Sequence, residues 1–464
     1  MKKFLNSKYF YIIILIVFIS LSFLIGSKHE PWADETQAWL IARDTSISEL
    51  FTKVLHTDGH PALWHLILKF FQFLGLSYKY FYIIPIIFSS LGVGVFLFKS
   101  KFPWYIKLLL PFTYFIFYQY TIVARGYCLI LLLLCLLATI WDKKLEKIEI
   151  FTIIMILLIN SEAYTFMFAG AVFLCVIYEL IKKPKEFDKK TYLKIILNFG
   201  IIVLSFLITI LYVYPKSMAG TLKLPFYLSD AFFTNFFSTN AIVKIIISMV
   251  IIFYILNFIY KYNLKEFGKL CLFLAPVIIF FIVKCMNYYH VGIVLLITIF
   301  TFWIQKRTSD KAVIIFLLLV CIIQIPWSIK TSIDDYKYSY CTADQVADTI
   351  KKYDYNDLRI LGIGFWTNSV NLYFDENIFY NQYETGFFYF GSENSYFYES
   401  FNEYYISICT PEIVVTECHN PLDSNLLFYY NEYIFPSNLY VEGNTVDNTY
   451  YLYIRKDIDQ NIAN

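Results

Sequence analysis

Long apolar runs alternate with short basic segments over residues 1–329. A helix needs roughly 20 residues to cross a hydrocarbon layer of about 30 Å. The runs that meet or approach this length lie at 9–26, 80–98, 105–121, 127–141, 148–160, 164–181, 194–214, 240–260, 268–284, 290–304 and 312–329. This pattern predicts about eleven membrane-spanning helices. The first run resembles a signal peptide, but it has no small-x-small cleavage site and is interpreted as a retained helix.

Composition and charge support a polytopic α-helical membrane protein. The 464 residues are 58% hydrophobic and 16% charged, whereas soluble chains contain about 25% charged residues. Residues 1–329 contain 31 Lys and Arg against 16 Asp and Glu, while residues 330–464 contain 7 against 20. The acidic tail argues against a nucleic-acid partner, which requires a basic surface. The opposite charges suggest that the two parts face different solvents.

Whether the stretch at 60–75 crosses the membrane decides which side of the membrane each later loop faces. Its apolar part of about 14 residues reaches only roughly 21 Å as a helix. If it does not cross, 21 of the 31 positive charges before residue 330 fall in cytoplasmic segments, as the positive-inside rule requires. We therefore predict a multi-pass cell-membrane protein with a cytoplasmic N-terminus and an extracytoplasmic tail. The 60–75 stretch is then an interfacial or re-entrant helix.

The first outer loop, residues 27–79, contains four of the six histidines and is assigned to the membrane domain of residues 1–329. Ser46 and Glu49 form the pattern of a capping box, and the residues that follow predict an amphipathic helix. Before it lie Asp34 and Glu35, whose side chains would point about 100° apart on a helix. One acid is expected to act as a base or metal ligand and the other to cap or pair, unless both are surface residues.

Four short motifs occur in order on the predicted outer side: Asp34-Glu35, His60-Pro61-Ala62-Leu63-Trp64, Arg125-Gly126-Tyr127 and His290-Val291-Gly292. Together they resemble the GT-C fold membrane glycosyltransferases, in particular the bacterial relatives of protein O-mannosyltransferases and of aminoarabinose-lipid transferases. The resemblance covers roughly residues 10–140 and 285–305. That family usually has a second proline where Ala62 stands, and its nearby acidic residue is represented by Asp58, one position displaced.

Ionisable groups at the outer helix ends are candidates for substrate contact. Arg125 either extends to the membrane interface or clamps a lipid phosphate with its planar guanidinium, and Tyr127 adds a donor. His290 is either an interfacial residue or a substrate contact. No cofactor is required by these motifs. A divalent metal ion is left open, with Asp58, Glu162 and His290 as candidate ligands.

The acidic tail, residues 330–464, predicts one small α/β domain. A helix is expected over 342–353, N-capped by Thr342, and strands at 359–363, 412–416, 438–441 and 450–454. The tail has no Gly-rich phosphate loop, nucleophile elbow or metal cluster, so an accessory or acceptor-binding role is preferred.

The resemblance implies a membrane glycosyltransferase that moves a sugar from a polyprenyl-phosphate donor to an envelope glycan, lipid or protein acceptor on the outer face, with inversion. Asp34 is the expected base, with Glu35 beside it, and His60, Arg125, Tyr127 and His290 are the expected substrate contacts. The alternative is a transporter or flippase for lipid-linked sugars, although transporters place polar residues near the bilayer midplane. In this chain the charged residues cluster at the ends of the predicted helices.

Overall fold

The computed structural model describes residues 2–182, 187–213, 264–283, 288–339, 341–355, 358–381, 386–387, 403–417, 422–437, 440–441, 444–445 and 449–459. Contacts divide the chain into two units, each of which is described by itself. The helical unit comprises Met1–Gly26, Tyr82–Tyr212 and Gly220–Ser332, and the mixed unit comprises Ser27–Phe81, Val213–Ala219 and Ile333–Asn464.

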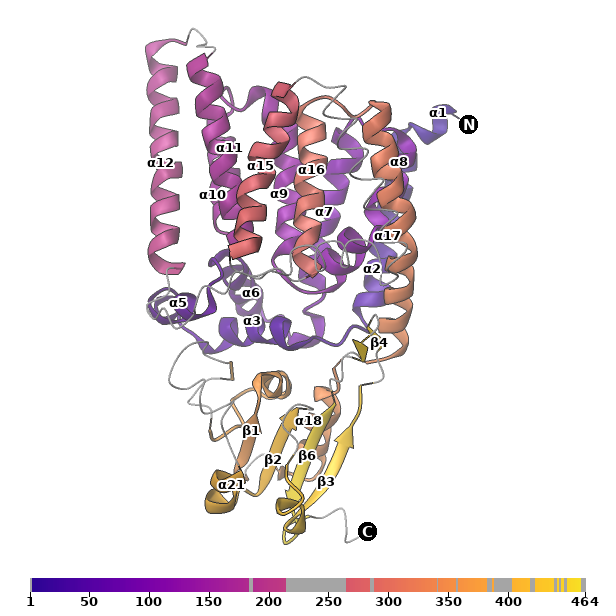
Figure 1. The fold of residues 1–464 in the computed structure, drawn as a ribbon, viewed down its shortest axis with the longest axis vertical. Helices are drawn as coiled ribbons and strands as arrows, with labels where there is room; N and C mark the ends of the chain where they lie inside the picture. The colour runs from indigo at the N-terminus through magenta and orange to yellow at the C-terminus, as the bar shows by residue number, and fades with distance from the viewer. Residues whose placement is uncertain are drawn as a thin grey trace. The chain divides into compact units, whose positions relative to one another are not determined.

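The helical unit is a bundle of apolar helices, drawn side by side in Figure 1. Its elements are α1 Lys2–Leu5, α2 Lys8–Gly26, α7 Ile83–Lys99, α8 Trp104–Leu109, η3 Leu110–Phe112, η4 Tyr114–Ile122, α9 Tyr127–Ile140, η5 Trp141–Lys143, α10 Ile148–Ile159, α11 Ala163–Lys182, α12 Lys189–Val213, α15 Leu264–Val283, η6 Tyr288–His290, α16 Val291–Ile304 and α17 Lys311–Lys337. The last turn of α17, from Ile333, is counted with the mixed unit.

Helix lengths and composition are compatible with a multi-pass membrane protein and do not test the number of spans. Among the described residues, five helical segments are long and apolar enough to cross a bilayer, namely Lys8–Gly26, Tyr78–Lys99, Ala163–Lys182, Lys189–Val213 and Lys311–Lys337. Three shorter apolar helices are Ile148–Ile159, Phe267–Phe281 and Val291–Ile304. The predicted span at 240–260 lies outside the described residues. The predicted count of eleven therefore stays a prediction.

The predicted span at 105–121 is divided into α8, η3 and the π-helical η4. Pro111 lies in the first turn of η3, where it supplies no backbone N–H to continue the preceding helix. The π-helix η4 packs closely on α16 because Gly292 has no side chain. A Cβ at Gly292 would lie 2.6 Å from the Phe115 ring. Gly292 thus allows η4 and the start of α16 to approach.

The mixed unit contains short helices and a small sheet. The helices are α3 Ala33–Asp44, α4 Ile47–Glu49, η1 Leu50–Val54, α5 Leu55–Asp58, α6 Leu63–Phe73, η2 Tyr78–Tyr80, α18 Ala343–Lys352, η8 Phe365–Thr367, α19 Asn368–Asn371, α21 Glu403–Cys409 and η9 Leu426–Phe428. The strands are β1 Ile360–Ile363, β2 Ile413–Glu417, β3 Tyr430–Phe435, β4 Tyr440–Val441, β5 Asn444–Thr445 and β6 Tyr450–Arg455.

The main sheet has the strand order β1-β2-β6-β3. Strands β1 and β2 are parallel, whereas β6 pairs antiparallel with both β2 and β3. All five residues of β2 are buried, as expected for an inner strand. The predicted helix over 342–353 is present as α18, with Val346, Ala347 and Ile350 buried. Thr342 does not cap it through its side chain, because its hydroxyl donates 2.7 Å to the carbonyl of Phe435.

The loop before α7 forms one compact unit with the tail. Ser27–Phe81 belongs to the same compact unit as Ile333–Asn464, although the sequence groups the loop with the membrane helices. Within this unit, α3 packs against α6 on one side and against α19 on another. The tail is therefore the structural partner of the loop that contains Asp34 and Glu35.

The predicted capping box of this loop is confirmed. The Ser46 hydroxyl accepts from the Glu49 backbone N–H at 3.1 Å, and the Glu49 carboxylate accepts from the Ser46 backbone N–H at 2.9 Å. The expected amphipathic helix is divided into α4, the π-helical η1 and α5. The stretch of the loop at 60–75 forms the 11-residue helix α6, which is too short to cross a bilayer.

Candidate functional site

The two adjacent carboxylates at the start of α3 have different environments. Glu35 is fully buried, and its Oε2 accepts from the backbone N–H of Trp32 at 3.1 Å. It therefore caps the first turn of α3, the second half of a capping box. Asp34 is only partly buried. The divergent placement of two neighbouring side chains agrees with the expectation that one of the two acids caps the helix, whereas the role of Asp34 as a base stays a prediction.

Glu35 also takes part in a buried charge network. His29 Nε2 lies 3.0 Å from Glu35 Oε2, and His29 Nδ1 lies 2.7 Å from Asp335 Oδ2. Carboxylates accept hydrogen bonds, so the imidazole donates from both nitrogens and carries a positive charge. Although burial lowers the pKa of His29, the charges of Asp335 and Glu35 and their hydrogen bonds raise it well above 6.5. The network links the residues before α3 to the end of α17.

Glu30 lies next to this network and is strongly perturbed. Burial first, then repulsion from Asp344, raises the pKa of Glu30 to about 8. Its Oε1 is buried and has no hydrogen-bond partner in the part of the chain that the structure describes. Glu30 is thus a protonated carboxylic acid at neutral pH.

The predicted contact His60 lies in the turn between α5 and α6. Gly59 ends α5 with a φ of 73°, a left-handed conformation that favours glycine. His60 is partly buried there. The candidate ligand Asp58 precedes the turn, and its Oδ2 lies 3.7 Å from Nε2 of the buried His65. Asp58 and His65 form an ion pair when the histidine is protonated.

In the helical unit, Arg125 lies beside two aromatic rings. Its guanidinium carbon is 5.5 Å from the centroid of the Tyr127 ring and 5.6 Å from that of Tyr289, within the range of cation–π attraction. The Tyr127 hydroxyl is buried and has no hydrogen-bond partner among the described residues. Such buried donors are rare in folded proteins and call for an explanation.

His290 belongs to the same group of side chains. Its ring is 6.1 Å from the Tyr127 ring, and its Nδ1 shares a 3.0 Å hydrogen bond with the Tyr164 hydroxyl. The Tyr120 hydroxyl donates to the carbonyl of Tyr289 at 2.8 Å, which fixes the residue before His290. We call the set Tyr120, Arg125, Tyr127, Tyr164, Tyr289 and His290 the aromatic cluster. Its members come from η4, the start of α9, α11, and η6.

Glu162, directly before α11, is 3% exposed and lies two residues before Tyr164 of the aromatic cluster. In the described part of the chain, no group of three or more His, Cys, Asp or Glu residues is arranged to hold a metal ion. Asp58 belongs to the mixed unit, whereas Glu162 and His290 belong to the helical unit. A metal role for these three residues stays a prediction.

The structure therefore gathers the predicted residues into two groups. Arg125, Tyr127 and His290 meet in the aromatic cluster, and Asp34 and Glu35 open α3. Sequence reasoning gave no role to His29, Glu30 or Asp335. His29 and Asp335 are 306 residues apart, and no local pattern marks them as partners.

Chemically, the aromatic cluster can recognise an anion, because it contains both a planar cation, Arg125, and a buried hydroxyl donor, that of Tyr127. Comparison of the chain with family models, with curated proteins and with solved structures gave no significant match.

Proposed function

We propose that this protein is a membrane glycosyltransferase that uses a polyprenyl-phosphate-linked sugar. The observation that carries the proposal is the buried Tyr127 hydroxyl, which has no hydrogen-bond partner among the described residues, on a ring whose centroid lies 5.5 Å from the Arg125 guanidinium carbon. A phosphate would supply the acceptor oxygens that this hydroxyl lacks and the negative charge that Arg125 attracts. A donor with a hydrocarbon tail would bring such a phosphate to a bundle of apolar helices.

In this proposal Arg125 and Tyr127 hold the donor phosphate, and His290 orients it from the same cluster. The guanidinium also stabilises the charge that develops on the leaving phosphate as the bond from its oxygen to the anomeric carbon breaks. These residues therefore bind the transition state more tightly than the ground state.

We assign Asp34 the role of general base. It takes the proton of the acceptor hydroxyl while the oxygen forms a bond to the anomeric carbon on the face opposite the leaving phosphate. One displacement inverts that carbon. Glu35 is unsuited to this role, because its Oε2 already accepts from His29 and from Trp32. Glu35 and His60 are assigned to positioning.

The test is sugar transfer from a polyprenyl-phosphate donor by the full-length protein in detergent, normalised to folded protein. Asp34→Asn keeps the size of the side chain but cannot take the proton, so turnover should fall by about 10² to 10⁴. Donor binding should persist. Glu35→Gln is the matched comparison, because its amide oxygen can still cap the helix and it should lower the thermal stability through the lost ion pair with His29.

Near-normal turnover by Asp34→Asn would refute the assignment of Asp34 as the general base. Absence of transfer by the unmutated protein to glycan, lipid and peptide acceptors, together with transport of the donor in vesicles, would favour the transporter instead.

A further inference from the structure

Residues of the tail contact helix α3 at three places, namely its start, its middle and its end. At its start, Asp335 binds His29, which binds Glu35. All three side chains are almost inaccessible, with exposures of 1%, 5% and 0%. Since Glu35 Oε2 also accepts the Trp32 backbone N–H, a shift of Asp335 is transmitted to the first helical turn. Asp34 lies in that turn.

The middle of α3 is bound through side-chain amides. Asn368, the first residue of α19, donates from Nδ2 to Gln37 Oε1 at 2.8 Å. Both side chains are buried, with Gln37 4% and Asn368 1% exposed. A hydrogen bond in such surroundings is costly to break, because each group would remain buried and unpaired.

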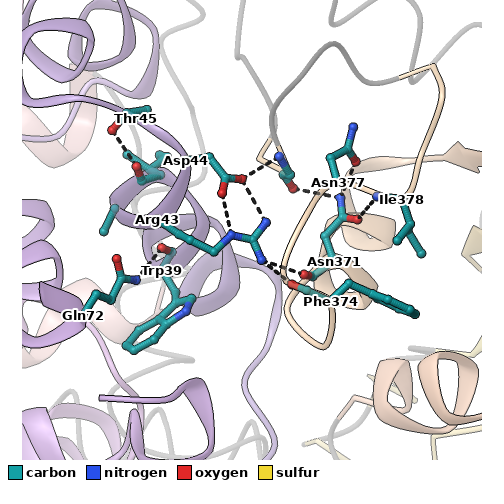
Figure 2. A network of polar contacts seen from close by, with 12 residues as sticks. Trp39, Arg43, Asp44, Thr45, Gln72, Asn371, Phe374, Asn377 and Ile378 are labelled. Atoms are coloured by element: carbon teal, nitrogen blue, oxygen red, sulfur yellow. Dashed lines mark hydrogen bonds and ion pairs between the residues drawn. The ribbon is translucent and has the colours of Figure 1, made fainter. Parts of the chain in front are cut away.

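The end of α3 is bound through Arg43 and Asp44, as Figure 2 shows. Arg43 donates from Nη1 to the carbonyl of Asn371 at 3.1 Å and to that of Phe374. Asp44 Oδ2 accepts from the backbone N–H of Gly386 at 2.7 Å and from Arg43 at 3.0 Å. These bonds join the last turn of α3 to the end of α19 and to residues that follow it.

On another side, α6 supplies the remaining polar contacts. Lys69 donates to the carbonyl of Ala42 at 2.7 Å, and Gln72 donates to that of Trp39 at 3.0 Å. A helix of 12 residues is marginal by itself in water. Its placement therefore depends on partners from both α6 and the tail.

We infer that the tail acts as the positioning frame of α3, and that Asp335 is a positioning residue that acts through His29 and Glu35 on the turn containing Asp34. The inference rests on the proposed function for its catalytic consequence, but its structural part can be measured without any substrate. The tail is then part of the transferase rather than an accessory domain.

The first measurement is amide hydrogen exchange across α3 in the full-length protein in detergent. Asp335→Asn removes a charged partner of His29, so exchange at residues 35–39 should be faster by about 10- to 100-fold. Asp334→Asn is the matched control, since this neighbouring carboxylate is only partly buried, and its exchange should be unchanged. Asn368→Ala should accelerate exchange in the middle of α3, which separates local loosening from global unfolding.

The second measurement is the turnover of the same variants. Asp335→Asn should lower kcat at least about 10-fold with the KM for the donor unchanged, because only the geometry of the base is altered. Asp335→Glu keeps the negative charge, so its kcat should lie between that of Asp335→Asn and that of the unmutated protein. A merely structural role would lower the amount of folded protein and leave kcat alone.

Unchanged exchange in α3 in both Asp335→Asn and Asn368→Ala would overturn the inference, whatever their activity. Faster exchange with unchanged kcat would overturn the positioning role of Asp335. If the unmutated protein transfers no sugar, the proposed function fails, and the exchange result alone decides whether the tail positions α3.

Discussion

Glu30→Gln should stabilise the mixed unit, and increasingly so as the pH rises. Burial and neighbouring acids raise the pKa of Glu30 from 4.5 to about 8. An acid whose pKa is raised by folding favours the folded state less and less as the pH rises from its unfolded to its folded pKa. The penalty is therefore absent well below pH 4.5, grows up to about pH 8 and is constant above it.

The size of the stability change follows from the pKa shift of Glu30. One pKa unit corresponds to about 1.4 kcal/mol, so the full shift corresponds to about 5 kcal/mol as an upper bound. Because the Glu30 side chain is not completely removed from solvent, screening reduces this to about 2 to 4 kcal/mol. Glutamine keeps the shape of the protonated acid and does not ionise, so Glu30→Gln should recover most of that energy at pH 8 and little at pH 5.

The assay is the thermal unfolding of full-length protein in one detergent at pH 5 and pH 8, followed by tryptophan fluorescence. The raised pKa of His29 also makes stability fall at alkaline pH, since the imidazolium and its two ion pairs are lost there. Glu30→Gln should thus reduce the pH dependence without abolishing it. Glu376→Gln, at an exposed carboxylate, is the control. An equal gain at both pH values, or no gain at pH 8, would refute the reasoning.

Three further predictions concern the membrane topology, the packing at Gly292 and the binding of the donor phosphate. Reporters fused after Lys183 and after Asp335 should read cytoplasmic and extracytoplasmic respectively, and a common side for both would refute the eleven-span topology. Gly292→Ala should destabilise the protein by about 1 to 3 kcal/mol, because the added Cβ would overlap Phe115 and Tyr120. The measurement is the unfolding temperature, which should be lower. In the control Gly200→Ala nothing lies within 4 Å of the added Cβ, so the unfolding temperature should not fall. Arg125→Lys keeps the charge but loses the planar fork, so the Kd for a polyprenyl phosphate should rise by the equivalent of about 1.5 to 3 kcal/mol, and an unchanged Kd in Arg125→Ala would exclude Arg125 from the site.

Local patterns predicted local structure well. The capping box of Ser46 and Glu49 and the buried face of α18 follow from spacing within a few residues, and both are confirmed. Each predicted apolar run within the described residues is helical. Strand β3 was not anticipated, because its sequence Tyr-Asn-Glu-Tyr-Ile-Phe mixes polar and aromatic residues on an edge of the sheet.

Long-range pairing could not be predicted in the same way. The bonds of His29 to Asp335 and of Gln37 to Asn368 each join residues more than 300 positions apart. Their energies depend on three-dimensional burial, which hydrophobic periodicity does not encode. The resemblance implied Arg125, Tyr127 and His290 as substrate contacts, whereas their proximity to one another and to Tyr164 became visible only in the structure.

The joining of the first loop to the tail has a consequence for biosynthesis. His29 and Asp335 are 306 residues apart, so at synthesis rates of about 5 to 20 residues per second roughly 15 to 60 s separate their emergence. Strand β6, which pairs with both β2 and β3, is made later still. Throughout this interval α3 lacks the partners that later bury Gln37 and Glu35. The nascent loop is therefore a segment for a chaperone or protease to recognise, and completion of the sheet removes that signal.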